Sequence, residues 1–119
     1  MIRLINCLRA KPGVSPEQFK QYWDNPAFGD LIKKMTHILG ATHCHKRLTL
    51  KVPHNDWIAL MRGTQGDPYD ATIEYWFKNQ QPFDDAWGTD ELMNIGRDML
   101  AYQSQFIDQQ KSVAFFTEG

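Results

Sequence analysis

The stretch from Asp70 to Lys78 reads DATIEYWFK and is the clearest strand signal in this 119-residue chain. Large apolar side chains occupy every second position, at Ile73, Tyr75 and Phe77. Glu74 and Trp76 alternate with them and therefore point to the opposite side of the sheet. We predict a strand with one apolar face and a second face that carries a carboxylate next to an indole.

The sequence after this strand predicts a helix and a closing strand. Residues Pro82–Gln105 have helical periodicity, with a break at Gly88-Thr89. Thr89 is a good N-cap for the second part, because its side chain can accept a hydrogen bond from the first helical turn. Residues Lys111–Thr117 are predicted to form the last strand.

The sequence before Asp70 predicts a strand, a helix and a second strand. Residues Met1–Arg9 are largely apolar and form the first strand. Ser15 to Gln18 reads SPEQ, which combines an N-cap serine, a proline at the first helical position and a capping glutamine. Pro26 interrupts the helical pattern that follows, so we expect a kinked or two-piece helix that ends at Gly40. Residues Ala41–Val52 alternate as a strand.

This order of elements predicts one α+β domain over residues 1–119, with a ferredoxin-like β-α-β-β-α-β fold. Its sheet would have four antiparallel strands with both helices on one face. The long connection Pro53–Pro68 is expected to hold a short helix or a lid, because structureless loops of this length are uncommon. Nothing in the chain covers the other face of the sheet, which carries Trp76. We expect that face to pair with another subunit.

Composition and charge narrow the classes of function. Thirteen Lys and Arg balance fourteen Asp and Glu, for a net charge of −1, which removes the electrostatic attraction on which nucleic-acid and anionic-membrane binding depend. No apolar run approaches the roughly 18 residues that a membrane span needs. We therefore expect a soluble, cytoplasmic domain with no nucleic-acid or membrane partner. Seven Phe, four Trp and four Tyr suit a subunit interface or an apolar pocket.

Four segments in order resemble the EthD-domain family of the dimeric α/β-barrel superfamily. They are Met1–Leu4 with Lys11–Glu17, the "F-x-x-Y-W" helix of Phe19, Tyr22 and Trp23, the strand Tyr69–Phe77, and Phe106–Asp108 followed by Ser112–Glu118. The resemblance implies a homodimer whose two sheets pack into a barrel, with a pocket between sheet and helices in each subunit. It also implies an oxidoreductase, although some fungal relatives are decarboxylases or dehydratases of polyketide aromatics. Related barrels include cofactor-free monooxygenases and haem-binding enzymes, so the fold does not fix the chemistry.

One position departs from the family pattern. The family commonly has a histidine four residues after the tryptophan of the "Y-W" pair, and this chain has Ala27 there. If that histidine is the family's acid/base group, this protein has lost it or replaced it from elsewhere.

Glu74 is the first candidate for proton transfer. A carboxyl group beside the indole of Trp76, in a partly buried site, would hold its proton more readily than one in water. The alternative is an ion pair with an arginine of a neighbouring strand or subunit; the candidates are Arg3, Arg9 and Arg47.

His43 and His45 are the second candidates. They alternate on the second strand and point to the same face, about 7 Å apart. Two such ligands do not complete a metal site, and no third donor lies nearby, so we expect a polar strand surface or a single acid/base histidine, preferably His43. Cys7 and Cys44 have no metal-ligand spacing and are predicted to be small buried thiols.

These patterns lead to a homodimeric EthD-type enzyme acting on a small apolar or aromatic molecule. We expect catalysis by Glu74, His43 and Tyr22, and a substrate pocket lined by Phe19, Trp23, His45 and Trp76. Tyr22 has a second interpretation as part of the aromatic core. No phosphate-binding motif is present, so no nucleotide is expected, nor a metal or other cofactor. The alternatives are a non-catalytic small-molecule-binding dimer, favoured by Ala27, and a haem- or metal-binding barrel that uses His43 or His45.

Overall fold

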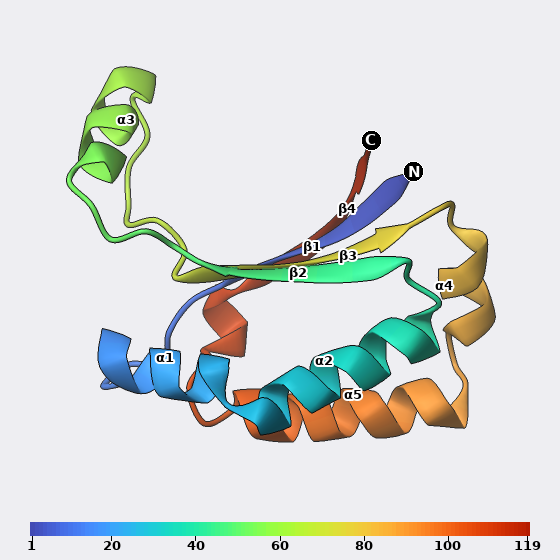
Figure 1. Ribbon diagram of the computed structural model, residues 1–119. Coiled ribbons are helices and arrows are strands. Elements are labelled where there is room, and N and C mark those ends of the chain that lie inside the picture. The colour runs from blue at the N-terminus through green and yellow to red at the C-terminus, as the bar shows by residue number, and fades with distance from the viewer.

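The computed structural model describes all 119 residues as one antiparallel sheet with helices packed on one face (Figure 1). The strands are β1 (Ile2–Leu8), β2 (His43–Leu48), β3 (Ala71–Phe77) and β4 (Val113–Glu118), in the order β2-β3-β1-β4. The helices are α1 (Pro16–Asp24), α2 (Pro26–Leu39), α3 (His54–Arg62), α4 (Gln81–Ala86) and α5 (Asp90–Gln103), with a 3-10 turn, η1 (Gln109–Lys111). The predicted α+β ferredoxin-like fold is confirmed. No helix is long and apolar enough to cross a membrane.

The first predicted helix is divided in two, as the proline indicated. The side chain of Ser15 accepts a hydrogen bond from the Gln18 backbone N–H, and the Gln18 side chain accepts one from the Ser15 N–H. Asn25 ends α1 and caps the start of α2. Gly40 ends α2 with φ of 70°, and a Cβ there would lie 2.7 Å from the Cβ of Pro82. Only glycine fits this position.

The second half also follows the local signals, with shorter elements. Thr89 caps α5 by accepting a hydrogen bond from the Leu92 backbone N–H at 3.2 Å. The strand predicted over Ala41–Val52 is shorter, because only His43–Leu48 pairs with β3. The chain then leaves the sheet, and the expected short helix forms as α3.

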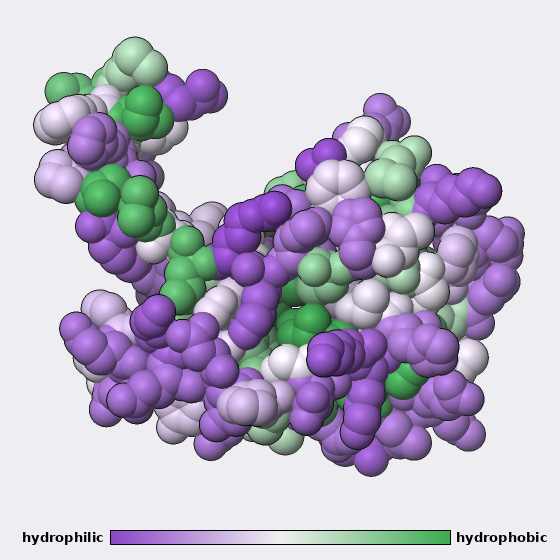
Figure 2. Space-filling model, in the orientation of Figure 1, coloured by the Kyte–Doolittle hydropathy of each residue, from purple (hydrophilic) through white to green (hydrophobic).

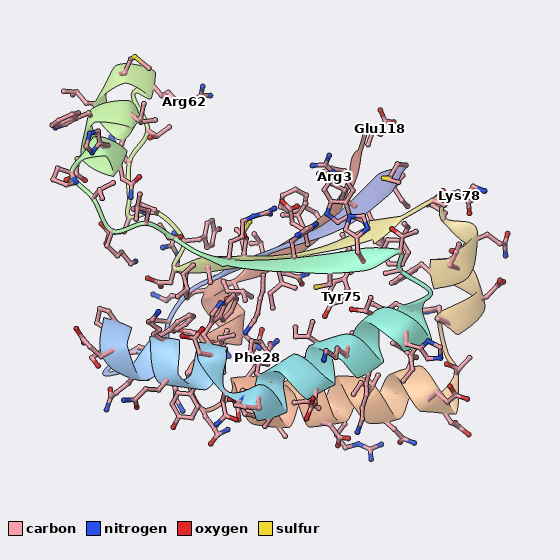
Figure 3. The ribbon with its side chains drawn as sticks, in the orientation of Figure 1. Arg3, Phe28, Arg62, Tyr75, Lys78 and Glu118 are labelled. Carbon is pink, nitrogen blue, oxygen red and sulfur yellow. The ribbon has the colours of Figure 1, made fainter.

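The sheet has two different faces. On β3 the side chains of Ala71, Ile73, Tyr75 and Phe77 are buried, and those between them are not. Figure 3 shows the same alternation: Tyr75 points toward the helices and Arg3 points away from them. We call the helix-free side the open face. It carries Arg3, Ile5 and Cys7 of β1, His43, His45 and Arg47 of β2, Thr72, Glu74 and Trp76 of β3, and Val113, Phe115 and Thr117 of β4.

The core lies between the sheet and α1, α2 and α5. Its three largest fully buried side chains are Phe28, Phe77 and Phe106. Phe19 packs edge-on against Phe106, and Trp23 packs against Phe28 with ring centroids 5.4 Å apart. This aromatic cluster fills one end of the space between the layers. Beside it, the space between the sheet and α5 is not filled.

Candidate functional site

A cavity of about 790 Å³ lies between the sheet and the helices. Its floor is formed by side chains of β1 and β3, and its walls by α2 and α5. Twelve of the eighteen lining residues are hydrophobic. Met35 and Leu39 come from α2, and Leu92 and Met99 from α5. Its volume and apolar walls are typical of a site for a small organic molecule.

Four neutral polar side chains line this cavity from different elements. Asn6 of β1, Tyr75 of β3 and Gln103 of α5 are buried or partly buried, and Gln109 of η1 is exposed. The Asn6 amide donates to the Ile73 carbonyl at 3.1 Å, and the Gln103 Oε1 accepts from the Gln109 amide at 2.7 Å. The Asn6 Oδ1, the Gln103 Nε2 and the Tyr75 hydroxyl have no hydrogen-bond partner in the chain. A ligand can therefore meet one acceptor and two donors there.

The ionisable groups of the cavity are few. Burial raises the pKa of the Tyr75 phenol far above its ordinary value, and the nearby Cys44 thiol adds to the effect. Tyr75 is therefore a neutral donor over the whole physiological pH range. Arg97 lines the cavity but is exposed, so its charge lies at the mouth. No carboxylate, imidazole or thiol belongs to the lining.

The predicted residues of α1 lie away from this cavity. Phe19 and Trp23 are buried in the aromatic core. The ring of Tyr22 stacks on Phe106 at 5.1 Å and borders a separate, polar hollow of about 620 Å³. That hollow is lined mainly by polar side chains and backbone, including Gln18, Gln21, Asn25 and Gln105.

The other predicted residues gather on the open face. The Trp76 ring lies between the Arg3 guanidinium, 3.8 Å from a ring centroid, and the His43 ring, with centroids 4.7 Å apart. The register pairs His45, rather than His43, with Glu74. Glu74 forms an ion pair with Arg47, whose Nη1 lies 3.4 Å from the Glu74 Oε2. Arg47 is one of the three arginines that the sequence offered as ion-pair partners of Glu74.

The structure thus separates the predicted site residues into two groups. Within one chain Trp23 is buried on the helix side of the sheet, and Trp76 lies on the open face. Alternate residues of a strand point to opposite faces, so the sheet itself lies between Trp76 and the helices. The roles of the individual residues stay predictions.

The histidines and cysteines do not form a group that could bind a metal ion. His43 and His45 form a pair, and no cluster of three or more His, Cys, Asp or Glu side chains occurs. Cys7 and Cys44 are free and partly buried. Burial raises the pKa of the Cys44 thiol to about 11, against a smaller opposing effect of its hydrogen bond with Thr36.

Sequence reasoning missed the residues that line the cavity, although two of them carried a signal. Asn6 is a polar residue between Leu4 and Leu8 on the otherwise apolar side of β1. Gln103 follows Met99 by four residues and is therefore on the buried face of α5. A polar side chain on a buried apolar surface is a better indicator of a binding site than an aromatic one, because burial costs it free energy unless it is hydrogen-bonded.

Comparison with known proteins identifies the chain's relatives. The sequence profile of the EthD domain matches residues 11–109. The chain belongs to the EthD family. This confirms the resemblance seen in the sequence. A search of functionally curated proteins finds no significant match for this EthD-domain protein.

Solved structures share its fold. An ethyl tert-butyl ether D (EthD) family protein of Bacillus halodurans is 17% identical, with a TM-score of 0.62, and the match covers 100% of this chain and 98% of the other. A protein of Bacteroides fragilis, described as dimeric, of unknown function and with a ferredoxin-like fold, is 10% identical over 99% and 95% of the two chains, with a TM-score of 0.59. A protein of Arabidopsis thaliana is 15% identical over 100% and 95%, with a TM-score of 0.56.

Proposed function

We propose that this EthD-domain protein is a homodimer that binds a small apolar or aromatic molecule, bearing neutral polar groups, between its sheet and helices. The observation that carries the proposal is the apolar cavity with three unpartnered neutral groups on its walls. Such walls favour a ligand by roughly 25 cal/mol for each Å² of apolar surface removed from water. Asn6, Tyr75 and Gln103 would select ligands whose hydroxyl, carbonyl or amide groups can form hydrogen bonds with these three side chains.

The cavity lining also limits the charge that a ligand can carry. An ionised group deep in the cavity would lose its hydration and meet no opposite charge. Only a carboxylate at the mouth would find a partner, in Arg97. We therefore expect neutral molecules, or anionic ones whose charge stays at the mouth.

The open face supports the homodimer. Ile5, Val113 and Phe115 bring apolar side chains to a sheet surface that no part of the chain covers. The structurally similar protein from Bacteroides fragilis is described as dimeric, which supports a dimer of this chain.

Acid/base chemistry at the open face is the second candidate function. It has a carboxylate and two imidazoles on adjacent strands, which the cavity lacks. Glu74 and His43 would then transfer protons, as general base and acid, to and from a ligand held at the subunit interface. The reaction would be that of an oxidoreductase or a lyase. Full turnover of an identified substrate by both Glu74→Gln and His43→Ala would exclude it.

Native mass spectrometry of untagged protein tests the first proposal. We expect a dimer, with added mass of a small organic molecule that is lost on denaturation. Tyr75→Phe and Asn6→Leu would reduce the occupancy of that ligand, whereas Tyr22→Phe would not. A monomer at all concentrations would refute the homodimer. Added mass that matches haem would favour the haem-binding alternative, and unchanged occupancy in all three variants would refute the assigned cavity.

A further inference from the structure

Residues 49–69, which we call the arm, leave the body of the molecule between β2 and β3. Figure 1 shows the arm, with α3 at its tip, on the side of the sheet opposite to α1, α2 and α5. No residue of α3 is buried. The arm therefore contributes nothing to the core of its own chain.

The tip of the arm is apolar. The exposed fractions are 62% for Trp57, 53% for Ile58, 84% for Leu60 and 76% for Met61. At about 100° per residue these four side chains share roughly 160° of the helix surface. Figure 2 shows apolar side chains gathered on the arm, while most of the visible body surface is polar. Exposed apolar patches of this kind mark interaction surfaces.

α3 needs an external partner to persist as a helix. It has nine residues and no side-chain cap at its start, and isolated helices shorter than about 12 residues are marginal in water. Most helical stability in proteins comes from packing of an apolar face, and the chain offers this face nothing to pack against.

The base of the arm, by contrast, is firmly attached. Thr49 donates hydrogen bonds from its backbone to the Asp70 carbonyl at 3.0 Å and from its hydroxyl to the Tyr69 carbonyl. Lys51 forms an ion pair with Asp70 at 2.7 Å, and Asp70 also accepts a hydrogen bond from the Ala10 N–H at 2.6 Å. The direction in which the arm leaves the sheet is therefore set by the fold.

We infer that the apolar face of α3 packs against the second copy of this chain, so that each subunit's arm clasps its partner. This rests on the proposed homodimer. The arm rises on the side where a second sheet would lie, and it is continuous with the open face through the ends of β2 and β3. A stable interface buries about 800 Å² on each partner. The apolar side chains of the open face are interspersed with charged ones, and the arm adds four exposed apolar side chains to the surface available for this interface.

Two-fold symmetry gives each dimer two such contacts, because the same surfaces are used on both subunits. One aromatic and three aliphatic side chains per arm then leave water on dimerisation. Tryptophan is one of the residues that most often dominate interface energetics, and methionine is enriched at interfaces.

The test compares a triple variant, Trp57→Ser with Leu60→Ser and Met61→Ser, with a control on the polar side of the same helix, Asp56→Ser with Arg62→Ser. Sedimentation over a range of concentrations gives the dimer dissociation constant. We expect the triple variant to raise it at least tenfold and the control to change it less than threefold. Since no α3 side chain is buried, both variants keep the core, and circular dichroism checks the fold.

Hydrogen exchange of the α3 amides is the second measurement. We expect at least tenfold slower exchange at concentrations where the wild type is dimeric than where it is monomeric. A wild type that is monomeric throughout would overturn the homodimer and the clasp together. A wild-type dimer with unchanged affinity in the triple variant, or with α3 amides that exchange as fast in the dimer as in the monomer, would overturn the clasp alone. Protection that appears only with vesicles of phosphatidylcholine and phosphatidylglycerol would assign the arm to a lipid surface instead.

Discussion

Gly96 offers a direct way to fill the cavity without disturbing the rest of the protein. It lies inside α5, lines the cavity, and has no heavy atom within 4 Å of the position that a Cβ would occupy. No positive φ and no close backbone approach requires glycine there. Its small size instead leaves room in the cavity.

The expected magnitudes follow from helix propensity and volume. Glycine in a helix interior costs about 1 kcal/mol relative to alanine, so Gly96→Ala should raise the free energy of unfolding by that amount and the Tm by about 4 °C. Gly96→Leu places a larger apolar side chain in the cavity. We expect its ligand-free stability to match or exceed that of the wild type, and its affinity for a cavity ligand to fall at least tenfold, which corresponds to about 1.4 kcal/mol.

The assay is a fluorescence titration with N-phenyl-1-naphthylamine, a neutral apolar dye, together with urea unfolding of the ligand-free proteins. Gly29 provides the matched control, because it lies in α2, has equally free space at its Cβ position and does not line the cavity. Gly29→Leu should keep the dye affinity of the wild type. If Gly96→Leu binds the dye as tightly as the wild type, the dye does not occupy this cavity and the proposed ligand site is wrong.

Three further predictions concern stability and reactivity. Burial disfavours the Asp70 carboxylate, but the Ala10 N–H and Lys51 outweigh it and hold its pKa below the ordinary 3.8. Its stabilisation is present above pH 3.8 and lost as the pH falls through the lower folded pKa. Asp70→Asn should therefore cost about 2 kcal/mol at pH 7 in urea unfolding, and a gap that does not narrow below pH 3.8 would contradict this. Cys44, with its pKa raised to about 11, should react with iodoacetamide at pH 8 about 100-fold more slowly than in unfolded protein; peptide mapping measures this, and equal rates would argue against burial. Tyr102→Phe removes a 2.6 Å hydrogen bond to an α1 carbonyl and should cost about 1 kcal/mol in urea unfolding while dye affinity is unchanged.

The sequence determined the local elements and their order. The capping signals at Ser15 and Thr89 act within one helical turn, so they can be read without any tertiary contact. The alternation around Tyr75 and Trp76 likewise fixes which side chains share a face of β3. The ferredoxin-like arrangement follows from these elements, because few topologies place two successive β-α-β units in one sheet.

The site could not be predicted in the same way, because it depends on contacts between distant parts of the chain. The aromatic helix of Phe19 and Trp23 looked like the wall of a pocket, but only the packed layers put it in the core. The cavity forms where α5 stands off from β1 and β3, and it joins Asn6 to Gln103 across nearly the whole sequence. Periodicity assigns a side chain to a face, whereas the space left between two faces depends on how all the layers pack, and only the tertiary structure decides that.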